Sequence, residues 1–167
     1  MAILLTDCKN LVAIDPGING GVALAKRDPS GMLWGIVTAF PLPQVPAQLA
    51  EELSNISRGG ETVVVVEDVH SMPAQGVASS FKFGRGLGRI EGVVAALKLR
   101  LEYLQPSAWT RTATGKTRSD FDGLTAWKRH LLEVATAAHP NLRPTLKTAD
   151  AILMARHIII QFSGRAQ

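Results

Sequence analysis

The apolar and polar positions divide the chain into short strand-like runs and longer segments with helical spacing. Near the N-terminus, aliphatic and aromatic runs lie between turn-forming Pro, Gly, Asn and Asp residues, a pattern typical of short β-strands. It predicts three strands, at residues 11–15, 21–26 and 32–40. The turn at residues 28–31 indicates that the second and third strands pair antiparallel.

Helices alternate with strands in the rest of the predicted fold. A β-branched run at residues 62–69 is typical of a strand covered on both faces, and residues 100–104 predict a fifth strand. Ser107 is the predicted N-cap of a short helix. Apolar residues recur at helical spacing in four further segments, residues 47–56, 76–97, 124–138 and 148–161. This order predicts a mixed α/β domain with a parallel central strand after a helical crossover.

Composition favours one globular domain that spans residues 1–167. Hydrophobic residues make up 46% of the chain and charged residues 19%, which argues against a disordered protein. Cys8 is the single cysteine, so an intrachain disulfide is excluded, and no apolar run is long enough to cross a membrane. The apolar N-terminal segment is too short and too weakly basic for a signal peptide. We therefore expect a soluble intracellular protein.

Positive charge is concentrated in the middle of the chain. The net charge is +4, and residues 82–129 alone carry ten basic and four acidic side chains. A basic centre suits a polyanionic partner, because neutralised phosphates release their counterions. A solvated basic face without a partner explains the charge equally well.

Three acidic residues lie where the predicted elements begin or end. Asp15 closes the first strand, Glu67 closes the run of valines, and Asp150 lies in the first turn of the last helix. Each has an ordinary interpretation alone, as a turn residue, a strand-end charge or a helix-dipole acid. Carboxylates at matching ends of adjacent strands can instead share one site, and such oxygen ligands suit Mg²⁺ or Mn²⁺. The matching chemistry is the attack of water on a phosphodiester.

Four motifs in the same order resemble RuvC-type Holliday-junction resolvases, and most closely their phage and organellar branch. The first is Ile-Asp-Pro-Gly at residues 14–17, followed by Gly-Gly-Val-Ala-Leu at 20–24. The most specific spans residues 66–85 and contains Met-Pro-Ala-Gln-Gly-Val and Phe-Lys-Phe-Gly. Residues 105–109 resemble the family's Pro-x-x-Trp segment, and residues 148–155 its C-terminal acidic helix.

This resemblance implies an RNase H-like fold, with a mixed five-stranded sheet flanked by helices. It implies a homodimer that makes paired nicks in four-way DNA junctions, and Asp15, Glu67 and Asp150 as ligands of Mg²⁺ or Mn²⁺. A phage origin would place the protein in the cytoplasm of a bacterial host.

The resemblance also implies that residues 72–83 face the junction. Phe81 and Phe83 are predicted to stack near unpaired bases, although core packing is an alternative for both. Helical spacing places Lys82, Arg85 and Arg89 on one face as candidate phosphate contacts. A second candidate phosphate patch consists of Arg111, Lys116, Arg118, Lys128 and Arg129.

One position departs from the family pattern. The family has a fourth acid or a histidine three or four residues before the last acid, where this chain has Leu146 and Lys147. An ammonium has no lone pair for a metal, so we predict that Lys147 acts near the scissile phosphate as an electrostatic or water-positioning group. His157 lies about 10 Å along the helix from Asp150, too far to replace the missing ligand. His70, in the loop after the fourth strand, is a weaker candidate.

Three alternatives remain open from the sequence. The chain could bind junctions with little or no cleavage. It could be an RNase H-like nuclease that acts on flaps or RNA–DNA hybrids. The Asp15-Pro-Gly turn also resembles the phosphate loop of actin-like ATPases, but those need a second such domain, for which the chain is too short.

Overall fold

A mixed five-stranded sheet forms the centre of the computed structural model, which describes residues 5–68 and 76–163. The strand order is β3-β2-β1-β4-β5. β2 pairs antiparallel with β1 and β3, whereas β4 runs parallel to both β1 and β5. The strands are β1 (Asn10–Ile14), β2 (Gly21–Arg27), β3 (Trp34–Pro41), β4 (Thr62–Glu67) and β5 (Arg100–Leu104).

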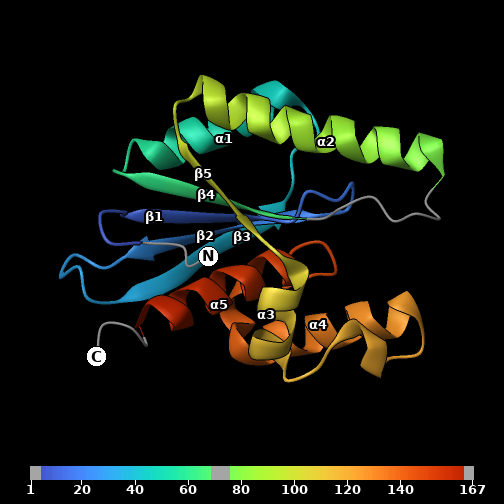
Figure 1. Ribbon diagram of the computed structural model, residues 1–167. Helices are drawn as coiled ribbons and strands as arrows, with labels where there is room; N and C mark the ends of the chain where they lie inside the picture. Colours follow the sequence, from blue (N-terminus) through green and yellow to red (C-terminus); the bar gives the residue numbers. More distant parts are fainter. Residues whose placement is uncertain (1–4, 69–75, 164–167) are drawn as a thin grey trace.

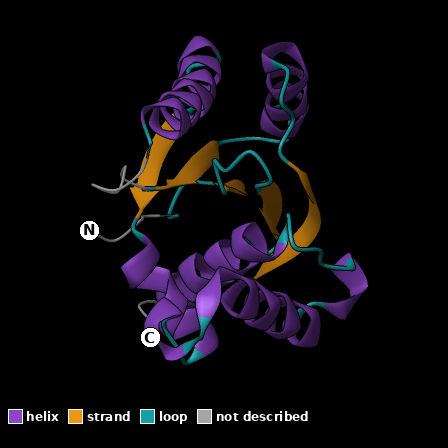
Figure 2. Ribbon diagram, turned by 90° about the vertical axis from the view of Figure 1, so that its right-hand side faces the viewer, coloured by secondary structure: helices purple, strands orange, loops and turns teal. Residues whose placement is uncertain are grey.

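Helices cover both faces of this sheet (Figures 1 and 2). The described helices are α1 (Pro46–Ser57), α2 (Val77–Ala96), α3 (Pro106–Thr114), α4 (Gly123–Ala138) and α5 (Ala149–Ser163), with short 3₁₀ turns at Arg118–Asp120 and Pro140–Leu142. α1 and α2 lie on one face, and α3, α4 and α5 lie on the other. None of the described helices is long and apolar enough to cross a membrane.

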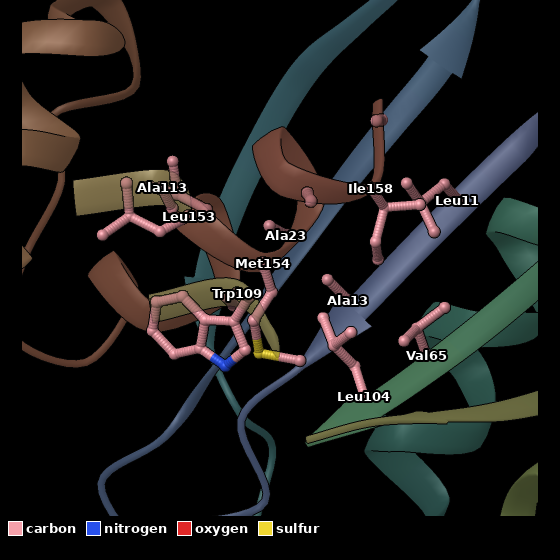
Figure 3. Packing of buried hydrophobic residues seen from close by; sticks show 14 of the residues in the cluster. Leu11, Ala13, Ala23, Val65, Leu104, Trp109, Ala113, Leu153, Met154 and Ile158 are labelled. Atoms are coloured by element: carbon pink, nitrogen blue, oxygen red, sulfur yellow. The ribbon is translucent and has the colours of Figure 1, made fainter. Parts of the chain in front are cut away.

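Alternation along the two central strands decides which residues face which layer. Val64 and Val66 of β4 pack with the α1–α2 layer, whereas Val63 and Val65 pack with the α5 layer. The same alternation places Glu67, one residue after Val66, on the α5 side. Figure 3 shows part of the α5-side cluster, with the indole of Trp109 among aliphatic side chains.

Small residues let α5 approach the sheet closely. A Cβ atom added at Gly21 would lie 2.3 Å from the backbone oxygen of Lys147 and 2.9 Å from Cα of Thr148. β2 therefore needs glycine where the segment before α5 crosses it. This close contact fixes the first turn of α5, and with it Asp150, against the end of the sheet.

The structure confirms the predicted order of strands and helices and corrects some local details. α3 begins at Pro106 and its N-cap is Gln105, so the prediction of Ser107 as N-cap was wrong. The reason is that proline suits the first helical turn, where its missing N–H would have had no partner. β3 begins at Trp34 rather than at residue 32, because Asp28 accepts hydrogen bonds from the N–H groups of Met32 and Leu33 in the preceding turn.

Candidate functional site

Asp15 and Glu67 lie side by side at the ends of the two central strands. Ile14 of β1 is opposite Val66 of β4 in the parallel ladder, so the next residue on each strand is an acid. Asp150 comes from the first turn of α5. The three residues are 9%, 8% and 5% exposed, respectively. Carboxylates this far from water need partners that offset their lost hydration.

The backbone of the following turn holds Asp15. Its Oδ1 accepts a hydrogen bond from the Gly17 N–H at 2.9 Å, and its own N–H donates to the Gly21 carbonyl at 3.0 Å. A Cβ atom at Gly20 would lie 2.1 Å from the backbone oxygen of Asp15, so the chain can return this closely only with glycine there. The Asp-Pro-Gly sequence motif is therefore a device that orients a carboxylate.

Trp109 holds Glu67. The indole Nε1–H donates a hydrogen bond to Glu67 Oε1 at 3.0 Å, and the ring is packed in the core between α3 and α5. The Pro-x-x-Trp segment was recognisable in the sequence, but no role was predicted for its tryptophan. The available signal was an indole, which needs a hydrogen-bond acceptor when buried, in a motif shared with the resolvases.

Lys128 reaches the same cluster from α4. Its Nζ lies 2.5 Å from Asp150 Oδ2, and the two side chains are 34% and 7% exposed. The other carboxylate oxygen of Asp150, Oδ1, is buried and has no hydrogen-bond partner among the described residues. Sequence analysis placed Lys128 in a phosphate patch, because nothing along the chain shows that α4 docks beside α5.

Burial and the nearness of the acids to one another shift the pKa values of the cluster. Burial raises the pKa of Glu67 to about 7, and the nearby charges of Asp15 and Asp150 add to the effect. Burial likewise raises the pKa of Asp150, although Lys128 opposes the shift. For Lys128, burial works against the ammonium, but the attraction of Asp150 and Asp15 outweighs it and raises its pKa. One ammonium thus faces three carboxyl groups.

The donor types at this site fit a hard divalent cation. Three carboxylates supply oxygen ligands, and Asp150 Oδ1 is a buried acceptor with free capacity. Among the described residues, however, no group of three or more Asp, Glu, His or Cys side chains is arranged closely enough to hold a metal ion without some movement. The ammonium of Lys128 stands at one of the required oxygens. A cation that bound Asp150 through Oδ2 would therefore require Lys128 to move.

Lys147 does not lie in this cluster as its predicted role requires. Its side chain is exposed, and its backbone oxygen packs against Gly21 of β2. The lysine that interacts with Glu67 and Asp150 is Lys128. The predicted catalytic role of Lys147 thus has no support from this arrangement and stays a prediction.

α2, which contains several of the predicted DNA-contacting residues, lies beside the acidic site. A Cβ atom at Gly86 would lie 3.7 Å from the backbone oxygen of Pro16, which places the helix beside the Asp15 turn. Phe81 is 68% exposed, so it does not pack in the core as the alternative interpretation proposed. Lys82 and Arg85 are also exposed, and Phe83 is half-buried.

Arg89 is tied to the protein itself. Its guanidinium donates to the backbone oxygen of Gln44 and to the Gln44 side chain at 3.2 Å. This contact joins α2 to the segment before α1 and reduces the capacity of Arg89 to contact a phosphate. Its predicted phosphate contact stays untested.

The second predicted basic patch lies on α3, on α4 and on the loop between them. Arg111 and Arg129 are exposed. In the loop, the ammonium of Lys116 lies 5.3 Å from the centre of the Phe121 ring, and Arg118 donates to the Phe121 backbone oxygen at 3.1 Å. These contacts order the loop. His70 and the first part of the predicted junction-facing segment lie outside the described residues.

The fold was compared with those of known proteins. No family model and no curated protein matches the chain. Solved structures do match, and the first is a Thermus thermophilus RuvC, with a TM-score of 0.56 and 17% identity over 94% of this chain and 96% of that one. The chain has a RuvC-like fold. The RNase H-like α/β class predicted from the motifs is thereby confirmed.

Two further structures support this assignment. T. thermophilus RuvC in complex with a Holliday junction substrate has a TM-score of 0.56 and 14% identity, over 94% of this chain and 96% of that one. The fowlpox virus Holliday junction resolvase has a TM-score of 0.52 and 13% identity, over 95% of this chain and 99% of that one. At these identities the likeness concerns the fold, and the activity has to be argued from the site.

Proposed function

We propose that this protein is a divalent-metal-dependent endodeoxyribonuclease that resolves four-way DNA junctions. The observation that carries the proposal is that three buried carboxyl groups, after β1, at the end of β4 and in α5, lie close enough for their charges to act on one another in a RuvC-like fold. No structural need of the core explains three buried acids with one balancing ammonium. Such an arrangement costs stability, and strained electrostatics of this kind are typical of catalytic sites.

Asp15, Glu67 and Asp150 would hold Mg²⁺ or Mn²⁺. When bound, the metal supplies an activated water and stabilises the charge of the leaving oxygen. The surrounding residues prepare the ligands: Gly17 orients Asp15, and Trp109 orients Glu67. Hydrogen bonds of this kind to metal ligands fix the direction of their lone pairs.

Exposed basic side chains beside the site would bind the DNA backbone. Lys82 and Arg85 lie on α2, which passes the Asp15 turn, and Arg111 and Arg129 lie on the α3–α4 side. Phosphate contacts of this kind position a duplex without reading its sequence. Phe81, which is exposed on α2, would stack on a base exposed at the branch point.

The proposed active form is a homodimer. A four-way junction offers two equivalent strands, so two copies related by a twofold axis can place one acidic site on each. Sedimentation of the protein alone and with junction DNA tests this part. A monomer that stays monomeric on the junction would contradict it.

A panel of substrates tests the proposed specificity. Labelled four-way junctions, flaps, RNA–DNA hybrids and linear duplexes of one sequence are incubated with the protein and Mn²⁺. Paired nicks near the branch point of the junction, at much lower protein concentration than any other cleavage, are the expected result. Preferential cleavage of the flap or the hybrid would contradict the proposed specificity and show that the same site acts on another class of substrate.

A junction-binding protein with weak cleavage is the second candidate. It is favoured by the contact of Lys128 with Asp150, because the ammonium stands where a metal would bind, and by the exposed Lys147 at the position of the fourth acid. Tight binding to the junction without nicks in Mg²⁺ or Mn²⁺ would support this candidate and exclude the first.

A further inference from the structure

Lys128 enters the acidic site because of where it lies on α4. The helix buries Trp127, Leu131 and Ala135, one stripe at helical spacing, and packs against α5. Lys128 follows Trp127 at the edge of this stripe and is half-buried, as is typical of a lysine that packs its aliphatic stem and exposes its charge. The ammonium at its end then meets the first turn of α5, where Asp150 lies.

The contact is more than a surface ion pair. Asp150 is 5% exposed, and the charges of Asp15 and Glu67 also act on Lys128. Surface pairs contribute little to stability, whereas removal of one partner from a buried pair leaves an uncompensated charge. In the metal-free protein, Lys128 therefore supplies the positive charge that allows three carboxyl groups to be buried together.

We propose that Lys128 is the built-in counter-cation of this site and competes with the divalent metal for Asp150. The inference rests on the proposed metal-dependent function and describes how the divalent metal enters the site. A metal bound by Asp150 would displace the ammonium, and the Lys128 side chain is 34% exposed, so it can turn towards solvent. The Lys128 ammonium is thus exchanged for the divalent metal. The need to displace it weakens metal affinity, and its charge stabilises the folded site when no metal is bound.

Direct metal binding without DNA tests the proposal. Mn²⁺ is titrated into wild type, Lys128→Gln and Lys128→Met by calorimetry or by electron paramagnetic resonance. Removal of the competing ammonium is expected to tighten Mn²⁺ binding by about tenfold or more, equivalent to ~1.4 kcal/mol. Equal or weaker binding in both variants would overturn the proposal, since the ammonium would then not oppose the metal.

Two control variants separate this effect from a general change in charge. Lys26→Gln makes the same substitution at an exposed residue of β2, and Lys147→Gln removes the exposed lysine before α5. Both are expected to leave Mn²⁺ affinity within about twofold of wild type, because solvent screens these exposed charges. Tighter Mn²⁺ binding by Lys147→Gln but not by Lys128→Gln would show that Lys147, not Lys128, competes with the metal. That result would refute our inference.

A charge-retaining variant guards against loss of folding. Lys128→Arg keeps a cation at Asp150, so it is expected to unfold near the wild-type temperature in EDTA and to bind Mn²⁺ no more tightly than wild type. Thermal unfolding in EDTA and in Mn²⁺ provides the readout if the neutral variants are unstable: Mn²⁺ should raise their melting temperature more than that of wild type. Failure of every protein, wild type included, to bind Mn²⁺ would refute the metal site itself. Equal binding by all would refute only the role of Lys128.

Discussion

At Glu67, the proposed role as a metal ligand conflicts with stability. Glu67 ends a strand of buried valines, and burial together with two neighbouring carboxylates raises its pKa to about 7. In the metal-free protein its charged form is therefore much less favoured than that of an exposed glutamate. A bound divalent cation would reverse this preference, because it attracts the carboxylate.

The raised pKa of Glu67 predicts how stability changes with pH. The folded state holds the Glu67 proton more tightly than the unfolded state, so unfolding free energy should fall as pH rises from about 4.5 to about 7. Glu67→Gln keeps an oxygen that accepts from Trp109 but cannot ionise. In urea unfolding with EDTA, the variant should exceed wild type by about 3 kcal/mol at pH 8 and by little at pH 4.5. An equal difference at both pH values would contradict this account.

Trp109 predicts a loss of activity without a loss of fold. Trp109→Phe keeps an aromatic ring in the core but removes the N–H that orients Glu67. The expected result is a decrease in junction nicking of about 10- to 100-fold, as for other partners of metal ligands. Trp34→Phe is the matched control, since Trp34 lies opposite Arg27, at the end of β2 remote from Gly21 and the acids. If both variants lose activity equally, the hydrogen bond is not the cause.

At the scale of elements, the site depends on how closely α5 approaches β2. The two elements meet where Gly21 lies against the backbone before α5, and Asp150 follows within three residues of that contact. Carboxylates that share a cation must be held to within a fraction of an ångström. The packing of α5 is therefore part of the chemistry of the site.

Gly21→Ala tests this dependence. The added methyl group would meet backbone atoms of Lys147 and Thr148, which cannot turn away as a side chain can. We expect a loss of about 1–3 kcal/mol in unfolding free energy, together with weaker Mn²⁺ binding. Gly35→Ala on β3 is the control, because nothing lies within 4 Å of its added carbon. Wild-type stability and Mn²⁺ affinity in Gly21→Ala would contradict the proposed constraint.

The elements were predictable where a local pattern determines them. The fifth strand was predicted with its observed bounds, Arg100–Leu104, and the valine run correctly indicated a central strand. The adjacency of Asp15 and Glu67 followed from the first strand and the valine run, which pair in parallel. Lys128 was not predictable as a neighbour of Asp150, because the docking of α4 on α5 depends on tertiary packing between segments 22 residues apart.

At the scale of the whole molecule, positive charge is arranged around an acidic centre. Eight of the ten basic residues at positions 82–129 divide between α2, which passes the Asp15 turn, and the α3–α4 side of the site. DNA phosphates would be attracted to the rim, and the buried acids would be reached once a metal offsets their charge. This arrangement predicts that binding depends on salt more strongly than on metal.

Salt dependence measures the contribution of α2. Replacement of Lys82 and Arg85 together by Gln should make the slope of log affinity against log salt shallower by about 2 on junction DNA in EDTA. The double variant Lys26→Gln, Arg58→Gln removes the same charge from exposed positions away from the site and should leave the slope near that of wild type. Identical slopes in all three proteins would show that α2 does not contact phosphates.

Junction cleavage by wild type and Asp15→Asn tests the central claim most directly. Asparagine keeps the oxygen that accepts the Gly17 N–H, so the fold and junction binding should persist while the ligand charge is lost. Wild type should nick a synthetic four-way junction in Mg²⁺ or Mn²⁺ and not in EDTA. Asp15→Asn should bind the junction equally and cut it about 100-fold more slowly, or not at all. Equal cleavage by the two proteins would contradict the assignment of these acids as the catalytic site.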